Sequence, residues 1–173
     1  MNFEQLLDQI VGDAQQKAEA LLTMWEQGQL NDDQFIEALA YLVDNSRARG
    51  AHGGLTVLRD YLEAELQQPV ILNVQFPESS VDGLPKAVQT ILNSNQETRM
   101  QVLRLVSGET LSAAHSAYES TLKQESRVKG WKRGLEADAC ELCQWWSREG
   151  KVWPKDHHMP THTGCKCHQV PII

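Results

Sequence analysis

All four cysteines of this 173-residue chain lie between positions 140 and 167. They form two close pairs, Cys140 with Cys143 and Cys165 with Cys167, and four of the six histidines lie between positions 157 and 168. Thiolate sulfur and imidazole nitrogen are ligands that Zn²⁺ binds well, usually four of them in a tetrahedron. The clustering therefore predicts a zinc site in the last part of the chain.

The first ligand pair is clear from its spacing, and the second is open. Cys140 and Cys143 form a Cys-x2-Cys knuckle that places two sulfurs on one side of a tight turn. His162 and Cys165 repeat this spacing, whereas Cys165 and Cys167 would face the same way in an extended segment. We predict Cys140, Cys143, His162 and Cys165 as the ligands, with Cys167 as the alternative ligand.

A site with four protein ligands is structural rather than catalytic, because no coordination position remains for water or substrate. A segment as short as residues 127–173 also buries too little apolar surface to fold reliably without a cross-link. We therefore expect a structural zinc ion, no catalytic residue, no small-molecule substrate and no enzymatic activity.

Three other interpretations of the cysteines are a redox pair, disulfide bonds and buried thiols without a metal. A redox Cys-x2-Cys pair normally opens a helix after a strand in a βαβ unit, and no such pattern precedes Cys140. Residues 1–5 lack the basic flank and apolar stretch of a secretory signal, so we expect a protein made and used in a reducing cytosol. In that compartment paired cysteines more often bind metal than form disulfides.

A β-hairpin is predicted between the two ligand pairs. Trp145 and Trp146 precede the turn-forming stretch 147–150, and the β-prone stretch 151–153 follows it. These two tryptophans, together with Trp153, are expected to form a small apolar core around the metal.

Apolar residues recur at steps of three and four along most of residues 1–126, which is the pattern of amphipathic helices. Residues 1–49 are predicted to form a helical hairpin, in which Gly28 ends the first helix and Asn31 caps the second.

Glycine and proline divide the rest of this helical body. A glycine cluster predicts a break after the hairpin, followed by a helix over 54–68. Residues 69–85 are predicted to form a crossover in which 70–76 is a short strand or extended segment. Residues 86–126 are predicted to form long helices with a break or kink at Gly108. The glycines of the first break are Gly50, Gly53 and Gly54.

The predicted fold class is mainly α, of the α+β type. It consists of an N-terminal helical body over residues 1–126 and a small C-terminal zinc-bound β-hairpin module over residues 127–173.

Charge is distributed unevenly between these two parts. Residues 127–173 carry eight Lys or Arg and five Asp or Glu, whereas residues 1–126 carry eight and eighteen. Phosphate binding requires clustered basic side chains, so any contact with DNA would involve residues 127–173 rather than the acidic body. No apolar run approaches the roughly 20 residues that cross a bilayer, and we expect a soluble protein without a membrane partner.

Several short motifs occur in a fixed order toward the C-terminus, and their order resembles the C-terminal end of the MuF-like minor head proteins of tailed bacteriophages. Members typically read Cys-x2-Cys, a Leu-Asp-Gly-Lys-Val-Phe-like hairpin, His-Pro-Asn-Cys-Arg-Cys and a closing Val-Pro-Val. The resemblance covers roughly residues 100–173 and includes 105–110, where Ser107 replaces a usual Arg. The motifs in this chain are Cys140-x2-Cys143, Gly150-Lys151-Val152-Trp153, His162-x2-Cys165-x-Cys167 and Val170-Pro171-Ile172.

The resemblance implies a low-copy component of the phage head that is associated with the portal or capsid protein. It implies a protein that is made in the host cytoplasm, is located in the head interior of the virion, and acts in head assembly, genome packaging or genome ejection. Some relatives bind DNA, so packaged DNA is a further expected partner of residues 127–173.

Two alternatives belong to other functional classes. Residues 156–160, Asp-His-His-Met-Pro, resemble the first part of an HNH nuclease motif, in which one histidine activates water and another holds a divalent ion. Only thirteen residues follow Pro160, which leaves no room for the rest of that motif. The other alternative is a zinc-finger regulator that binds DNA, and the small positive excess of residues 127–173 argues against it.

Overall fold

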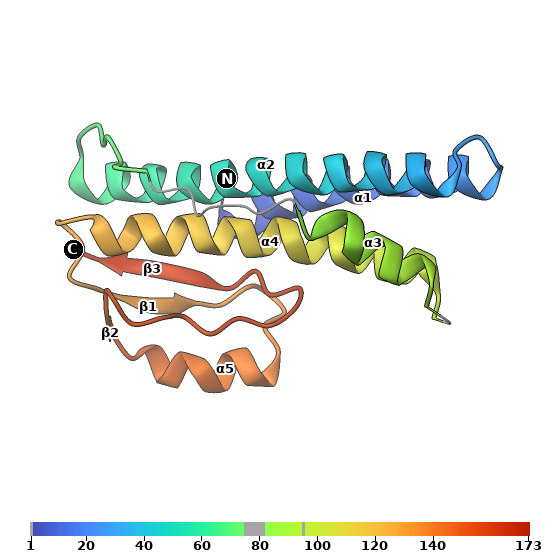
Figure 1. Ribbon diagram of the computed structural model, residues 1–173. Coiled ribbons are helices and arrows are strands. Elements are labelled where there is room, and N and C mark those ends of the chain that lie inside the picture. The colour runs from blue at the N-terminus through green and yellow to red at the C-terminus, as the bar shows by residue number, and fades with distance from the viewer. Residues whose placement is uncertain (1, 75–81, 95) are drawn as a thin grey trace.

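A computed structural model describes residues 2–74, 82–94 and 96–173. Three long helices lie side by side, and a small three-stranded sheet packs against one of them (Figure 1). The helical elements are α1 (Phe3–Glu26), α2 (Asp32–Leu66), α3 (Leu84–Leu92), α4 (Thr98–Gln124), α5 (Glu141–Ser147) and a 3-10 turn, η1 (Arg148–Gly150). The strands are β1 (Gly130–Gly134), β2 (Trp153–Pro154) and β3 (His168–Ile172).

These elements confirm the predicted mainly α fold with a small C-terminal β part. The sheet is antiparallel in the order β2-β1-β3, with Trp131 opposite Trp153 on one side and Pro171 on the other. In Figure 1, β3 lies next to α4, and α5 lies on the far side of the sheet. The C-terminal part therefore has layers of helix, sheet and helix.

The predicted helical hairpin is confirmed for α1 and the start of α2. The Asn31 side chain accepts a hydrogen bond from the Gln34 backbone N–H at 2.9 Å, and the Gln34 side-chain oxygen accepts one from the Asn31 backbone N–H at 3.0 Å. This capping box satisfies two of the backbone donors that open a helix. Gly28 adopts φ +70° just after α1, as expected for a residue that ends a helix.

The predicted break at Gly50, Gly53 and Gly54 is wrong, because α2 continues through all three residues. The glycines serve packing instead of termination. A Cβ at Gly54 would lie 2.7 Å from the Ala114 carbonyl oxygen of α4, and one at Gly50 would collide with the Thr110 carbonyl oxygen. Absence of a side chain thus allows α2 and α4 to approach closely.

Two other local predictions concern Gly108 and residues 70–76. The helix α4 runs through Gly108 without a break. Residues 70–74 form neither helix nor strand, and the rest of the predicted 70–76 segment lies outside the described residues. The backbone of this segment is anchored at Val70, whose N–H donates to the Glu63 carboxylate at 3.0 Å.

The predicted hairpin around residues 147–150 is also wrong. Trp145 and Trp146 lie in α5, and β2 pairs with β1 instead of with these two residues. Residues three apart in a helix share one face. Cys143 and Trp146 therefore both turn toward the cysteine cluster, whereas Trp145 is exposed.

One apolar core joins the helical body to the C-terminal segment. Side chains of α1, α2 and α4 pack with Trp131 of β1 and Met159 of the loop before β3. The phenol of Tyr118 donates to the Gln169 carbonyl at 2.7 Å, and that of Tyr61 donates to the Pro171 carbonyl at 3.2 Å. The division at residues 126 and 127 stays a prediction, although packing crosses it. Among the described residues, no helix has the length and apolar character needed to cross a membrane.

Gly54→Ala should destabilise the protein by about 1–3 kcal/mol, because the added methyl meets backbone of α4. The matched control is Gly108→Ala, which places a methyl where nothing lies within 4 Å in the same bundle. That control should stabilise the protein by up to about 1 kcal/mol through helix propensity. Denaturant unfolding of the two variants beside the parent measures both effects, and equal stabilisation by both would contradict the packing role.

Candidate metal centre

Five side chains capable of binding a metal lie together in the C-terminal segment. Their ligand atoms form two overlapping groups, each with all members within 4.8 Å of one another. The first group is Cys140, Cys143 and His162, and the second is Cys143, Cys165 and Cys167. Cys143 belongs to both and is fully buried. The structure therefore brings together all five residues singled out from the sequence as ligands or alternative ligand.

Local backbone structure places each pair. Cys140 is the N-cap of α5 with an extended backbone, and Cys143 follows in the first turn. On the other side, the Cys165 backbone N–H donates to the His162 carbonyl at 3.0 Å. This tight turn includes Gly164 at φ +83°, a conformation that favours glycine. The spacing of three residues in each pair thus produces a turn that points both ligand atoms inward.

The ring of His162 is oriented as a metal ligand should be. Its Nδ1 lies 3.0 Å from the Thr163 carbonyl oxygen, which can only accept a hydrogen bond. In the neutral ring the proton is then on Nδ1, and the lone pair is on Nε2. This Nε2 faces the sulfurs of Cys140 at 3.3 Å and Cys143 at 3.1 Å. A carbonyl that holds the far nitrogen is the usual support of a histidine that binds a metal.

The spacing of the sulfurs also suits a tetrahedral ion. Zinc–sulfur bonds of about 2.3 Å place two sulfurs about 3.8 Å apart across a tetrahedron. The Sγ atoms of Cys143 and Cys165 are 3.6 Å apart. Since Cys167 lies in the same group as Cys165, the choice of Cys165 over Cys167 stays a prediction.

The pKa values of the four thiols are shifted in different directions. A hydrogen bond from the Cys143 backbone N–H lowers the pKa of Cys140, whereas burial raises the pKa of Cys143 to about 12. A hydrogen bond with Cys167 lowers the pKa of Cys165, and the same bond raises the pKa of Cys167. A bound cation favours the thiolate of every ligand, so metal binding would release protons from this cluster.

Arg133 is a part of the centre that the sequence analysis missed. It lies on β1, is 5% exposed, and places Nη1 3.7 Å from the Cys143 sulfur. Its other terminal nitrogen donates to the Pro160 carbonyl, and the guanidinium lies 5.2 Å from the centre of the Trp146 ring. Three thiolates and one histidine around a Zn²⁺ ion would carry a net charge of −1, which this guanidinium would offset. The sequence signal that could have found it is the alternation of side chains along a strand, which turns Arg133 inward and Lys132 outward.

Only one of the three tryptophans predicted to surround the metal does so. Trp146 packs against the buried cysteines, whereas Trp145 is 58% exposed with Arg148 over its ring. Trp153 stacks on Trp131 and belongs to the core shared with the helices. The cysteine cluster therefore depends less on aromatic packing than expected.

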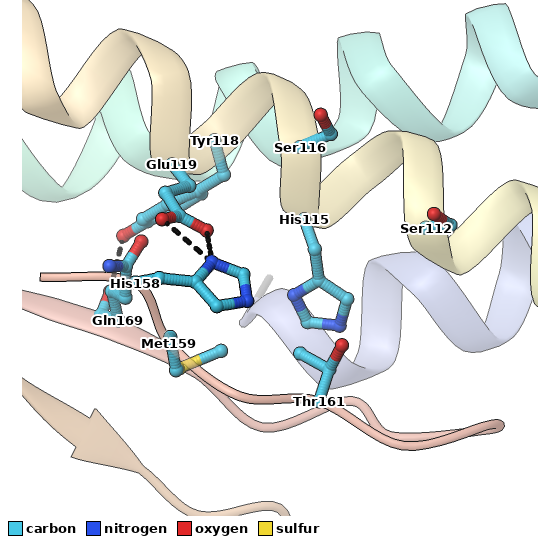
Figure 2. Close-up of a pocket in the computed structure, with 9 residues that line it drawn as sticks. All are labelled: Ser112, His115, Ser116, Tyr118, Glu119, His158, Met159, Thr161 and Gln169. Carbon is cyan, nitrogen blue, oxygen red and sulfur yellow. Dashed lines mark hydrogen bonds and ion pairs between the residues drawn. The ribbon is translucent and has the colours of Figure 1, made fainter.

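The two histidines of the HNH-like stretch lie outside this cluster, and each makes a different contact. His157 stacks on Trp153 at a ring-centre distance of 4.3 Å, with the rings nearly parallel. His158 instead contacts Glu119 of α4, with Nδ1 2.9 Å from a carboxylate oxygen (Figure 2).

The fold and the cluster define a mainly helical protein whose C-terminal segment contains a group of Cys and His residues that could hold a metal ion. Comparison of the chain with protein-family models, with curated proteins and with solved structures found no match.

Cys143→Ser should abolish metal binding, because Cys143 belongs to both ligand groups. Cys165→Ser and Cys167→Ser are a matched pair of variants, and their metal affinities should differ. The variant that removes the fourth ligand should bind metal more than about 100-fold more weakly, since loss of an outer hydrogen-bonding partner alone costs about 10- to 100-fold. Elemental analysis after purification and competition with a chelator measure these effects. Full metal content in Cys143→Ser would refute the site.

Arg133→Met should weaken metal binding by about 10-fold while the helices remain, because it removes the positive charge beside the thiolates. Lys132→Met is the matched control, since it removes a charge from the exposed face of the same strand. Chelator competition measures the affinity, and circular dichroism measures the helix content. Equal affinity of the two variants would show that Arg133 has no electrostatic role at the cluster.

Proposed function

We propose that this chain is a minor head protein of tailed bacteriophages, associated with the portal or capsid protein, whose C-terminal segment binds a structural zinc ion. The observation that carries the proposal is that the motifs resembling the MuF-like proteins are neighbours in space. Cys140 and Cys143 meet His162 and the Cys165/Cys167 pair, and the closing motif at 170–172 lies in β3.

Zinc is the ion we infer from the donor set. Sulfur and imidazole suit Zn²⁺, which takes four such ligands in a tetrahedron and has no redox chemistry of its own. Cys143, Cys165 and Cys167 are each at most 1% exposed, which fits an ion that holds the chain together rather than one that meets a substrate. The ion would tie α5 to the segment that leads into β3.

The C-terminal segment is also held to α1 by polar contacts. The Lys166 ammonium lies 2.8 Å from the Asp8 carboxylate. The Ala137 backbone N–H donates to the Glu4 carboxylate at 3.1 Å. A zinc-bound segment fixed in this way to long helices suits a protein that assembles with other head proteins and is then packed in the head interior.

Basic and aromatic side chains on the outer side of this segment support contact with packaged DNA. The Arg148 guanidinium lies 3.9 Å from the centre of the Trp145 ring, and the Lys151 ammonium lies 3.9 Å from that of Trp153. Lys132 and Trp145 are exposed. Basic side chains of this kind bind phosphates without reading sequence. The acidic helical body is then the part that meets the portal or capsid protein.

Co-purification tests the proposal directly. The tagged chain should co-purify with the portal or capsid protein encoded beside it, and should sediment with procapsids at low copy number. Cys143→Ser should reduce this incorporation at least several-fold, because the C-terminal segment loses its cross-link, whereas Gly108→Ala should be incorporated like the parent. Quantitative mass spectrometry of purified procapsids measures both.

Absence of the parent chain from procapsids, together with no binding to the portal or capsid protein, would overturn the proposal. Mg²⁺-dependent cleavage of plasmid DNA that is lost in His157→Ala would favour the nuclease alternative instead.

A further inference from the structure

A cavity of about 200 Å³ lies between α4 and the loop that precedes β3, beside the cysteine cluster. Figure 2 shows its lining, in which side chains of α4 meet residues of the loop and of β3. The lining includes His115, Glu119, His158, Thr161 and Gln169. None of these belongs to the two ligand groups of the cysteine cluster.

The ring of His158 is held by a carboxylate. Its Nδ1 lies 3.0 and 2.9 Å from the two oxygens of Glu119, and Lys123 pairs with the same carboxylate at 2.6 Å. A carboxylate accepts hydrogen bonds, so Nδ1 carries the proton and the neutral ring has its lone pair on Nε2. In Figure 2 this second nitrogen is turned toward His115.

The ring of His115 is held in the complementary way. Its Nε2 lies 2.8 Å from the Cys165 carbonyl oxygen, which can only accept a hydrogen bond. The proton is then on Nε2, and the lone pair is on Nδ1. Figure 2 shows this nitrogen facing the ring of His158.

Two imidazole lone pairs that face one cavity cannot hydrogen-bond to each other. Each can accept a hydrogen bond from water, since the His158 side chain is 72% exposed, and a metal ion with an imidazole on each side would engage both lone pairs at once. Histidines that bind metals typically have the other nitrogen held by a carboxylate or a backbone carbonyl, and His158 and His115 have one of each.

A second observation shows that the cavity contains an unused hydrogen-bond donor. Gln169 is 2% exposed and lines the cavity, and its Nε2 has no hydrogen-bond partner among the described residues. A buried amide without a partner costs about 1–3 kcal/mol. Water bound to a metal ion in the cavity would offer this donor an oxygen. The cavity volume leaves room for an ion with coordinated water.

We propose that His115 and His158 bind a second divalent transition-metal ion, of the Zn²⁺, Co²⁺ and Ni²⁺ class, whose remaining ligands are water. Glu119 and the Cys165 carbonyl are the positioning groups. The second ion is separate from the cysteine site in its ligands, and is linked to it because Cys165 supplies the carbonyl that orients His115.

The test uses the full-length chain loaded with one equivalent of zinc. Equilibrium dialysis against increasing Co²⁺ should give up to one bound cobalt per chain while zinc stays bound, with both metals measured by elemental analysis. Because nitrogen and oxygen ligands lack thiolate, the bound cobalt should show weak visible absorption and no sulfur-to-cobalt charge-transfer band. Loss of zinc with appearance of that band would mean exchange at the cysteines and would overturn the second site.

Two variants test His158 as a ligand and Glu119 as its positioning group. His158→Asn should weaken cobalt binding at least about 10-fold, and Glu119→Gln should weaken it by about 10- to 100-fold through misorientation of the ring. His157→Asn is the matched control, because it changes the neighbouring histidine that stacks on Trp153 and does not line the cavity. Unchanged cobalt affinity in His158→Asn or Glu119→Gln, or no cobalt bound by the parent, would overturn the proposal.

Discussion

Close packing of α2 on α4 is the constraint on which the rest of the structure depends. Backbone carbonyls of Thr110 and Ala114 occupy the space where side chains would lie at Gly50 and Gly54. This contact sets the position of α4, and α4 in turn presents Tyr118 to β3. Helix packing distances of 8–10 Å depend on side-chain size, so glycine at these two positions determines how near the helices lie.

The helix α4 in turn positions the C-terminal segment. Tyr118 anchors the backbone of β3, and His115, one turn earlier on the same helix, reaches the Cys165 carbonyl. Residues three apart on a helix share a face, which is why both side chains meet the segment that carries the second ligand pair. The geometry of the cysteine cluster thus depends on the helical bundle as well as on its own turns.

Charge in the cysteine cluster is opposed by two effects. Several thiolates close together repel one another, and burial opposes their charge, as the raised pKa of Cys143 indicates. A bound cation would reverse both effects, and the guanidinium at the edge of the cluster acts in the same direction. Arg133 can serve in this way because its two terminal nitrogens are divided between the Cys143 sulfur and the Pro160 carbonyl.

Local sequence signals predicted what depends on nearby residues. Asn31 caps α2 through atoms only three residues away, and the Cys140/Cys143 pair forms from one helical turn. The same reasoning failed where the decisive partner is distant. Glycine in a helix usually weakens it, and only the backbone of α4, about sixty residues further along, explains why Gly50 and Gly54 do not end α2.

The sequence by itself determined the helical body, the small C-terminal β part and the identity of the five candidate ligands, because periodicity and spacing are local properties. The tertiary structure alone decided that Arg133 lies beside Cys143 and that His115 and His158 face one cavity. Those pairs come from elements joined by packing across the chain, and long-range packing leaves no local pattern in the sequence.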